Sequence, residues 1–403
     1  MRICVVGCGA VGSLFAANLA TLDDVEVWAF DLNNAHVDAI NQNGLQLVGA
    51  GEVLGRPHAT SDPTAIPACD FGIVATKAMH ADAAIAATAH AFAGGAVASV
   101  MNGVGNEETL APHVERVIRG TTFPAGKLLE PGVVQWDVKG DTTFGPFEPR
   151  PIRVETIAPL AEACTRAGMP SKAVADARPG QWRKVIFNAA TNPMGALTGL
   201  THGRLCERPD LRAVVTGLVD EGKAVAAAQG IELDAEPEEL IDHAARPDVA
   251  YGHKASMLQD VEAHRMTEVD YLNGGIARFG RELGVPTPLH DTITALVKGV
   301  EASWAQGATA SVTGFGLFPT PFPTGLPSST GATPTSGRRW LPPSWTASSS
   351  PAASTRASRA PSRTCPASRS STATRTSSCP PRVIRSSSSR RRRATSASTE
   401  PRF

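Results

Sequence analysis

Three polar side chains recur at a fixed interval within an otherwise apolar stretch from Trp182 to Pro193. Lys184, Asn188 and Asn192 are four residues apart, so on a helix they lie on one face over successive turns. Burying such groups without hydrogen-bond partners costs about 2 kcal/mol or more each, and a buried lysine has a lowered pKa that suits it to proton transfer. The stripe therefore indicates a substrate-facing helix. The alternative is a lysine that reaches water and an asparagine that ends the helix before the proline.

A second group of functional residues is a glycine-rich run near the N-terminus, Gly7-Cys8-Gly9-Ala10-Val11-Gly12. It follows a β-type run and precedes an Ala/Leu-rich helical segment, which is the setting of a dinucleotide-binding fingerprint. Gly7 permits the tight turn, Gly9 lets the backbone approach a pyrophosphate, and Gly12 lets the helix pack close to the strand. The helix N-terminus supplies free N–H groups and a partial positive charge for the phosphates.

Further candidate residues follow other β-type runs. Asp31 ends the second run, where a carboxylate accepts hydrogen bonds from a ribose hydroxyl but repels a 2′-phosphate, so it favours NAD(H) over NADP(H). The alternative is an aspartate that caps a helix at 36–43. Lys77 and Asn102 follow the next runs, and ligands of open α/β sheets bind outside the carboxyl ends of the strands. Both are therefore candidate ligand contacts, or else ordinary turn residues.

The order of β-type and helical patterns predicts two domains. Alternating β runs and helices come first, then short strands from Val117 to about Phe147 that are expected to complete the same sheet, and a helix at 157–167. Helical patterns then follow at 180–198, 209–229, 236–245, 255–283 and 288–303. We expect an α/β Rossmann-type dinucleotide-binding domain over residues 1–175, and an all-α substrate and catalytic domain over residues 176–304.

The zero net charge of the 403-residue chain hides two unlike parts. Residues 305–403 hold 14 arginines, no lysine and one acidic residue, whereas residues 1–304 hold 24 basic and 37 acidic residues, a net charge of −13. The low-complexity tail, rich in Ser, Pro and Arg, cannot bury a core and is expected to be disordered. Its composition matches a GC-rich gene translated out of frame, so we hypothesise a frameshift. The alternative is a basic tail that binds nucleic acid or an anionic surface.

The seven cysteines are scattered, without a C-x-x-C pair or metal-ligand spacing. This pattern predicts reduced thiols in the cytoplasm and no metal site. No stretch reaches the roughly 18 uninterrupted apolar residues of a membrane helix. The apolar run before residue 20 has the length of a signal-peptide core, but glycines interrupt it and only Arg2 precedes it. We expect a cytoplasmic protein without membrane association, as a monomer or a homodimer.

Several pieces of the sequence resemble one family, the ketopantoate reductases (2-dehydropantoate 2-reductases), in order and in spacing. They are Gly7–Gly12, Lys77-Ala78, Asn102-Gly-Val-Gly105, Trp182-Arg-Lys184 with Asn188 and Asn192-Pro193, Ser256-Met-Leu-Gln-Asp260, and Thr267-Glu-Val-Asp-Tyr-Leu-Asn-Gly274. The resemblance covers residues 1–304. It implies a Rossmann domain, a helical domain like that of 6-phosphogluconate dehydrogenase, and NAD(P)H-dependent reduction of ketopantoate to pantoate in pantothenate and coenzyme A biosynthesis.

The resemblance also implies roles for single residues. Lys184 is similar to the family's proton donor to the ketone oxygen, and Glu268 to the acid that helps hold the cofactor and the active site together. The implied substrate contacts are Asn102, Asn188, Asn192 and Ser256. The implied cofactor contacts, besides the glycine-rich run and Asp31, are Lys77, Asn102 and Glu268. A lysine in an apolar cleft, with its pKa lowered by burial and moderated by a nearby glutamate, supplies a proton at neutral pH.

Three departures from the family bear on substrate and cofactor. His202 and His253 stand where familiar members carry asparagine near the substrate carboxylate, so a different 2-keto acid is an alternative. Asp31 stands near where many members place a basic residue for the 2′-phosphate, so the resemblance implies NADP(H) while this residue favours NAD(H). The rivals are a broader D-2-hydroxyacid dehydrogenase that uses NADH and, in another class, a non-catalytic dinucleotide-binding protein with a basic interaction tail.

Overall fold

The computed structural model describes residues 1–310, and side chains through residue 304. Apart from the end of the last helix, the tail expected from residue 305 falls outside the described residues. The hypotheses of disorder, of a frameshift and of nucleic-acid binding by that tail therefore remain predictions.

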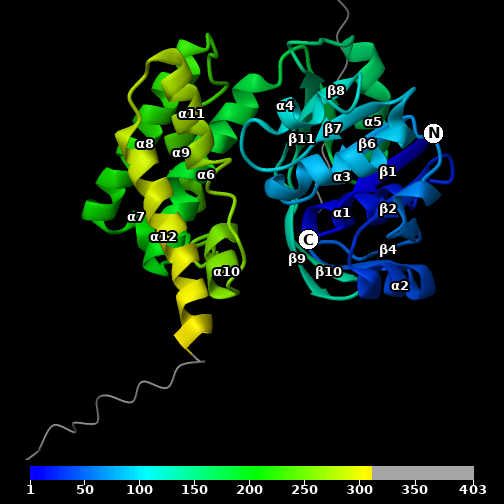
Figure 1. Ribbon diagram of the computed structural model, residues 1–403, viewed down its shortest axis with the longest axis horizontal. Coiled ribbons are helices and arrows are strands. Elements are labelled where there is room, and N and C mark those ends of the chain that lie inside the picture. The colour runs from blue at the N-terminus through cyan, green and yellow to red at the C-terminus, as the bar shows by residue number, and fades with distance from the viewer. Residues whose placement is uncertain (311–403) are drawn as a thin grey trace, which may run out of the picture. The chain divides into compact units, whose positions relative to one another are not determined.

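The first part of the chain is built on an eight-stranded sheet in the order β12-β11-β8-β7-β6-β1-β2-β5 (Figure 1). Its strands are β1 (Arg2–Val6), β2 (Glu26–Phe30), β5 (His58–Thr60), β6 (Phe71–Val74), β7 (Ala96–Ser99), β8 (Val117–Thr122), β11 (Thr142–Pro146) and β12 (Ser171–Ala173). All neighbours from β5 to β8 are parallel, β11 runs antiparallel to β8, and β12 is parallel to β11.

Both faces of this sheet are buried, because successive side chains of a strand point to opposite sides. In β1, Ile3 and Val5 belong to one apolar core, whereas Cys4 and Val6 belong to another. The helices of this part are α1 (Ala10–Leu19), α2 (Asn34–Asn43), α3 (Ala81–Thr88), α4 (Asn106–Leu110) and α5 (Val154–Arg166), with short 3₁₀ turns at Pro63–Ala65, Ala78–His80 and Ala89–Phe92. The predicted Rossmann-type architecture is confirmed.

A second, four-stranded sheet has the order β4-β3-β10-β9. Its strands are β3 (Leu45–Gly49), β4 (Val53–Gly55), β9 (Ala125–Glu130) and β10 (Val133–Val138). The prediction that the strands between residues 117 and 147 complete one sheet is right for β8 and β11 but wrong for β9 and β10. Val134 and Trp136 of β10 are buried in the same core as α1, and β10 pairs in parallel with β3. Burial of these two side chains accounts for the departure.

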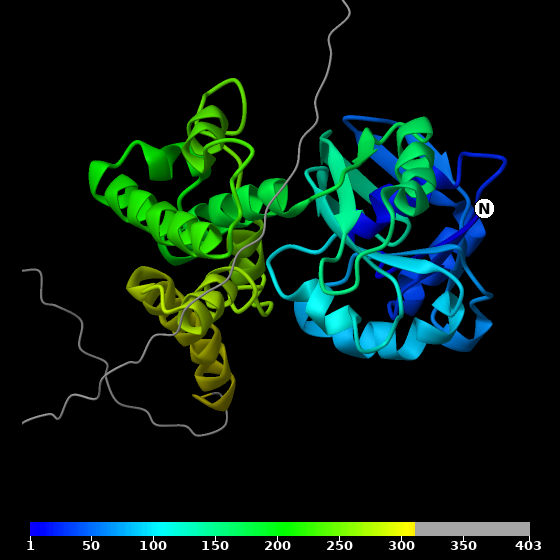
Figure 2. The same ribbon diagram turned by 90° about the horizontal axis from the view of Figure 1, so that it is seen from above.

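The second part of the described chain is helical. It contains α6 (Arg178–Thr198), α7 (His202–Cys206), α8 (Pro209–Ala228), α9 (Pro237–Ala244), α10 (Ser256–Glu262), α11 (Asn273–Leu283) and α12 (Pro288–Ala310). Figure 2 shows these helices from above, and residues 178–310 contain no strand. Their apolar faces form a core of their own, to which Trp182, Ile186 and Leu218 contribute. The predicted all-α part is confirmed, while the boundary at residue 175/176 stays a prediction.

Two local predictions in the helical part need correction. The helix expected over 255–283 is interrupted between α10 and α11, where His264 adopts a positive φ of 50° and Thr267 is bound by another helix. The alternative in which Asn192 ends its helix is also wrong, because α6 continues through Pro193 to Thr198. Tertiary contacts outweigh local propensity at both places.

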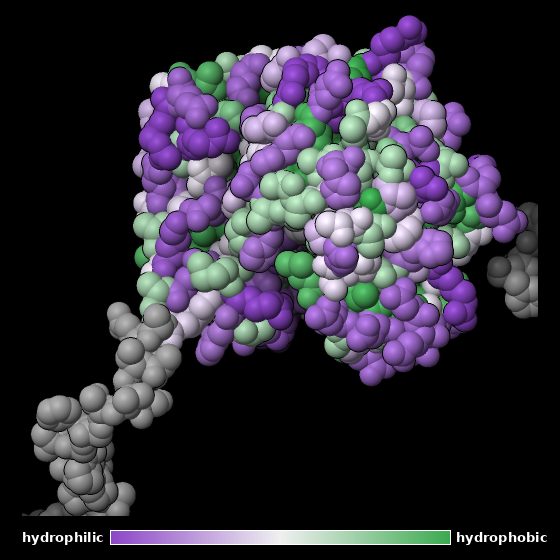
Figure 3. All heavy atoms as spheres, turned by 45° about the vertical axis from the view of Figure 1, so that its right-hand side comes forward, coloured by the Kyte–Doolittle hydropathy of each residue, from purple (hydrophilic) through white to green (hydrophobic). Residues whose placement is uncertain are grey.

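The face of the described part that Figure 3 shows is mainly polar. Figure 3 shows hydrophilic side chains over most of the visible face and hydrophobic residues only in small groups. None of the helices in residues 1–310 has the length and apolarity needed to cross a membrane. The five cysteines within these residues are free thiols.

Candidate active site

The segments that follow four neighbouring strands meet at the carboxyl edge of the main sheet. Gly7 follows β1, Lys77 follows β6, Asn102 follows β7, and Thr122 ends β8. These strands are parallel neighbours, so their carboxyl ends lie side by side. This is the place where open α/β sheets bind their ligands.

The glycine-rich run forms the turn between β1 and α1. Gly7 has a φ of +88°, which favours glycine, and a Cβ on Gly12 would lie 1.9 Å from the carbonyl oxygen of Gly7. A Cβ on Gly9 would meet no atom within 4 Å, and this residue is exposed. Gly9 also begins α1 without a side-chain cap, so the first N–H groups of the helix face outward. The turn thus fits the pyrophosphate of a dinucleotide.

Asp31 holds the glycine turn from the end of β2. Its Oδ2 accepts a hydrogen bond from the Cys8 N–H at 2.8 Å, and its Oδ1 accepts one from the Asn33 N–H at 2.8 Å. The alternative role as the cap of α2 is wrong, because the N-cap residue is Asn33. Residues 32–36 contain no lysine or arginine, and burial lowers the pKa of His36. The carboxylate therefore has no cationic neighbour in this segment.

Lys184 lies on α6 and reaches the carboxyl edge of the sheet. Its Nζ donates hydrogen bonds to Asn102 Oδ1 at 3.0 Å and to the Thr122 carbonyl oxygen at 2.5 Å, and lies 5.6 Å from the centre of the Phe123 ring. Burial lowers its pKa to about 8, against a smaller raising effect of the Glu268 carboxylate. An ammonium has three N–H groups, so one remains for a ligand.

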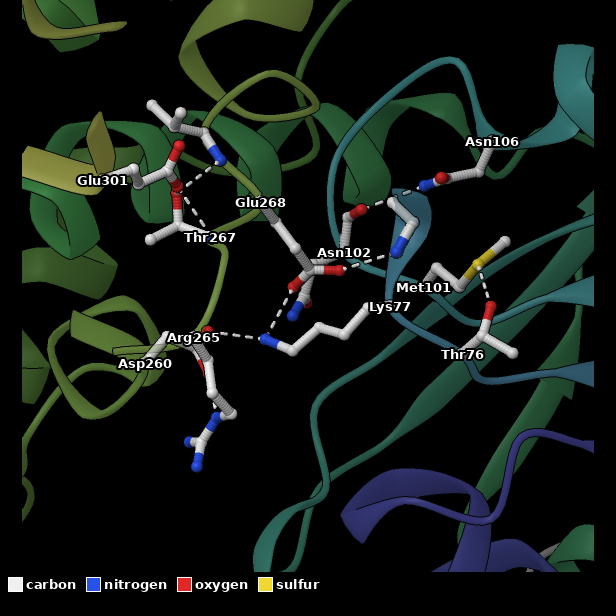
Figure 4. A network of polar contacts seen from close by, with 12 residues as sticks. Thr76, Lys77, Met101, Asn102, Asn106, Asp260, Arg265, Thr267, Glu268 and Glu301 are labelled. Carbon is white, nitrogen blue, oxygen red and sulfur yellow. Dashed lines mark hydrogen bonds and ion pairs between the residues drawn. The ribbon is translucent and has the colours of Figure 1, made fainter. Parts of the chain in front are cut away.

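Glu268 lies in the loop between α10 and α11 and faces the segment after β6 (Figure 4). Its Oε1 accepts the N–H of Ala78 at 3.1 Å, and its Oε2 lies 3.5 Å from Lys77 Nζ. Lys77 Nζ also pairs with Asp260 Oδ2 of α10 at 2.6 Å, and Asp260 Oδ1 accepts Arg265 Nε at 3.1 Å. Burial lowers the pKa of Lys77, but the two carboxylates outweigh it and hold that pKa above its usual value.

The remaining predicted residues follow α6 away from the sheet. Asn188 lines a small cavity together with Lys184 and Asn102. Asn192 is buried one turn further along, where its Oδ1 accepts a weak hydrogen bond from Thr191 Oγ1 at 3.5 Å. Ser256 begins α10 and is exposed. Because a Cβ on Gly195 would lie 3.7 Å from the Cβ of Ala255, Ser256 stands beside the C-terminal half of α6.

The two histidines that depart from the family pattern lie near each other. His202 is buried at the start of α7, with its ring 5.6 Å from that of Phe187 and its Nε2 3.0 Å from the Ile241 carbonyl oxygen. Burial lowers the pKa of His202, which favours a neutral ring. His253 is exposed, and its carbonyl oxygen accepts the N–H of His202 at 3.2 Å.

Several residues of the site have no clear signal in the sequence. The Thr122 carbonyl oxygen is a backbone atom, so no residue type marks it as a partner of Lys184. The sequence does mark Asp260, which lies one helical turn after Ser256 within a motif of the family resemblance. Arg119, Glu107 and Gln181 form a buried cluster behind Lys184 that only the tertiary structure brings together.

The sequence matches two family models. The model described as "Ketopantoate reductase PanE/ApbA" matches residues 3–149, and "Ketopantoate reductase PanE/ApbA C terminal" matches residues 176–301. The chain is 32% identical over 304 residues to the 2-dehydropantoate 2-reductase of Pyrococcus horikoshii, covering 75% of this chain and 98% of that protein. The enzyme of the same name from Archaeoglobus fulgidus is 33% identical over 303 residues, with coverage of 75% and 98%.

Solved structures show the same similarity. A PanE/ApbA family ketopantoate reductase from Ralstonia eutropha JMP134 superposes with a TM-score of 0.68 at 30% identity, over 76% of this chain and 100% of that one. D-mandelate dehydrogenase, in a ternary structure with NADH and anilino(oxo)acetate, gives a TM-score of 0.69 at 28% identity, with coverage of 76% and 100%.

Proposed function

The chain belongs to the ketopantoate reductase family, and on that premise we propose that it reduces 2-dehydropantoate (ketopantoate) to pantoate with NAD(P)H, in pantothenate and coenzyme A biosynthesis. The observation that carries the proposal is the lysine at the carboxyl edge of the sheet. Lys184 is held there by Asn102 and Thr122, with one N–H left over and a pKa lowered to about 8.

Reduction of a 2-keto acid requires a hydride at the carbonyl carbon and a proton at its oxygen. The bound nicotinamide supplies the hydride. Lys184 gives a proton from Nζ to the carbonyl oxygen as that oxygen gains charge, and the neutral amine then takes a proton from water. A pKa of about 8 keeps the lysine protonated at neutral pH, yet makes it a better acid than a lysine in water.

We assign the remaining roles from the positions of the side chains. Glu268 moderates the pKa of Lys184 and, with Asp260, holds Lys77 at the cofactor side of the site. Asn188, Asn192 and Ser256 extend from Lys184 along α6 to the start of α10, and we propose that they bind the substrate's polar groups.

The glycine turn and Asp31 form the cofactor side. The open position at Gly9 and the uncapped start of α1 fit a pyrophosphate, and thus a nicotinamide dinucleotide. Family membership points to NADP(H), whereas Asp31, followed by no lysine or arginine in residues 32–36, points to NAD(H). We propose that NADH is the better cofactor, because a 2′-phosphate would stand against an uncompensated carboxylate.

A second candidate function is a broader D-2-hydroxyacid dehydrogenase that uses NADH. Three features favour it: the similarity to D-mandelate dehydrogenase, the histidines at 202 and 253, and Asp31. A neutral His202 whose Nε2 faces a backbone carbonyl offers a substrate carboxylate less than an asparagine amide does. A steady-state assay of ketopantoate and other branched or aromatic 2-keto acids, each with NADH and with NADPH, separates the two functions by their kcat/KM.

The decisive experiment for catalysis is Lys184→Ala. We expect it to lower kcat by about 100-fold or more, as loss of a general acid does, while binding of the reduced cofactor, followed by its fluorescence, stays near that of the unchanged chain. Unchanged turnover would contradict the proposed mechanism. The non-catalytic rival predicts instead that the unchanged chain binds the cofactor and turns over no 2-keto acid.

A further inference from the structure

Behind Lys184 lies a buried polar cluster that the proposed mechanism does not use. Gln181 precedes Lys184 by one turn of α6, and both atoms of its amide are engaged. Its Oε1 accepts Arg119 Nη1 at 2.7 Å, and its Nε2 donates to Glu107 Oε1 at 3.0 Å. Arg119 Nη1 also bonds Glu107 Oε2 at 3.2 Å, and its Nη2 bonds Glu148 Oε2 at 2.7 Å. The exposed fractions of Glu107, Gln181 and Arg119 are 0%, 3% and 7%.

This cluster ties together the three segments that surround the lysine. Arg119 lies on β8, the strand that ends in Thr122, whose carbonyl oxygen binds Lys184. Glu107 lies on α4, which directly follows the segment of Asn102, the other partner of Lys184. Gln181 lies on α6 with the lysine itself and lines the same small cavity. The strand that ends in Thr122, the segment that carries Asn102 and the helix that carries Lys184 therefore each contribute one residue to the cluster.

A contribution to stability alone explains this arrangement poorly. A buried ion pair loses so much hydration that apolar side chains of the same shape often stabilise a fold equally well. What such a cluster supplies and apolar packing does not is a directional set of hydrogen bonds, here one that fixes the first turn of α6 against β8 and α4.

We propose that Gln181 is a positioning residue, which through Arg119 and Glu107 sets α6 in the register that places Lys184 between Asn102 and Thr122. The proposal rests on the proposed role of Lys184 as proton donor. Without the amide bridge the first turn of α6 moves relative to β8, the proton donor is misplaced, and water enters the small cavity. A misplaced catalytic group costs rate even when the substrate still binds.

The test is Gln181→Met, which keeps the length of the side chain and removes both hydrogen bonds. We expect kcat to fall about tenfold or more, while cofactor binding stays unchanged because the glycine turn is not involved. We also expect the pH at which kcat/KM falls on the alkaline side to rise from about 8. Burial is the main cause that lowers the pKa of Lys184, and water that enters the cavity reduces this burial. The substitution changes no charged side chain, so Glu268, Arg119, Glu107 and Glu148 are all present in the variant.

The matched control is Gln229→Met, directly after α8, where the side-chain amide donates to the Val225 carbonyl oxygen of that helix. We expect no change in kcat or in the pH at which kcat/KM falls. Gln181→Met with a lower melting temperature but with the kcat and the pH profile of the unchanged chain would overturn the proposal. If this variant does not fold, Gln181→Asn, a shorter amide that cannot reach both partners, decides by the same two readouts. An active Lys184→Ala would remove the proposed role of Lys184 as proton donor, and this inference with it. An inactive Lys184→Ala beside an unaffected Gln181→Met would remove the inference alone.

Discussion

The acidity of Lys184 results from two opposing effects on one ammonium group. Burial between α6 and the carboxyl edge of the sheet lowers its pKa, and the carboxylate of Glu268 raises it in part. The balance leaves the pKa at about 8, close enough to neutral pH for efficient proton transfer. The environment of the lysine therefore determines its chemistry more than its residue type does.

The pH dependence of the reaction follows from this pKa. Reduction needs the protonated lysine, so we expect kcat/KM for reduction to be high below about 8 and to fall as the pH rises through that value. Oxidation of the hydroxy acid needs the neutral amine and should rise over the same range. Initial rates in both directions between about pH 6 and pH 10 measure this, and parallel profiles for the two directions would contradict the assignment.

Glu268→Gln tests the opposing effect. The variant removes a carboxylate that raises the pKa of Lys184, so the alkaline limb of kcat/KM should move to lower pH. The cofactor KM should also rise, because Lys77 loses one of its two carboxylate partners. Glu262→Gln, which removes an exposed partner of Lys254, is the control and should leave the limb in place. If the pH at which kcat/KM falls stays the same or rises in Glu268→Gln, a group other than Lys184 controls the alkaline side of the profile.

At the scale of elements, the turn between β1 and α1 contains one glycine that we expect to matter for cofactor binding and another that we expect to matter for folding. We expect Gly9→Ala to fold normally, with a stability within about 1 kcal/mol of the unchanged chain, because its Cβ meets no atom. Cofactor affinity should fall about tenfold or more, since the new methyl group occupies the pyrophosphate position. Gly12→Ala should instead destabilise the fold by about 1–3 kcal/mol or more, because its Cβ would lie 1.9 Å from the carbonyl oxygen of Gly7. Thermal unfolding and cofactor titration of both variants measure this, and two variants that behave alike would contradict it.

The loop that carries Glu268 depends on α12. Glu301 Oε1 accepts both the N–H of Thr267 at 2.8 Å and its hydroxyl at 2.6 Å, and the ring of Trp304 stacks on that of His264 at 5.4 Å. Glu301→Ala should cost about 1–3 kcal/mol, the range for leaving buried donors unpaired, and should lower kcat by displacing Glu268. Amide hydrogen exchange across residues 263–272 should become faster. An unchanged exchange rate would show that the loop holds its shape without α12.

The elements that could be predicted from the sequence are those with strong local patterns. The glycine turn, the strand that precedes it and the face of α6 carrying Lys184, Asn188 and Asn192 follow from spacing alone. The break between α10 and α11 could not be predicted, because Thr267 and Glu268 are held by Glu301 and Ala78, far from them in the sequence. The departure of β9 and β10 to a second sheet likewise depends on the pairing of β10 with β3, in which Val133 lies opposite Gln46, 87 residues earlier.

Of the candidate site, the charged and amide side chains could be predicted, whereas their mutual contacts could not. The sequence predicts Lys77 as a cofactor contact, but its pairing with Asp260 exists only once α10 packs near the end of β6. The family resemblance gave Glu268 a role but no partners. Such contacts depend on where two separately folded segments meet, which no local pattern encodes.

At the scale of the whole described chain, the site is shared between the sheet part and the helical part. Lys184 and Glu268 come from the helical part, while Asn102, Thr122 and Ala78 come from the sheet part. Each part therefore lacks hydrogen-bond partners for its own functional groups until the other is in place. The two parts together supply the proposed proton donor and the proposed cofactor turn.

A chain that ends after Ala310 should keep its full activity. The relatives from Pyrococcus horikoshii and Archaeoglobus fulgidus align along 98% of their own length with about three quarters of this chain, and the site residues named above all precede residue 305. We expect equal kcat/KM and equal melting temperatures for the shortened and the full chain. A large loss of activity on shortening would give the Arg-rich tail a function and would count against the frameshift hypothesis.

The two hydrogen bonds that hold Lys184 also bear on the handedness of the product. Two of its N–H bonds are directed to Asn102 Oδ1 and the Thr122 carbonyl oxygen, so the third can point in one direction only. A flat ketone with its oxygen on this bond, and with its carboxylate held by the substrate contacts proposed along α6, presents a single prochiral side to the incoming hydride. The alcohol should therefore form as one enantiomer, and its optical purity should depend on how firmly the two oxygen atoms of the protein hold the amine.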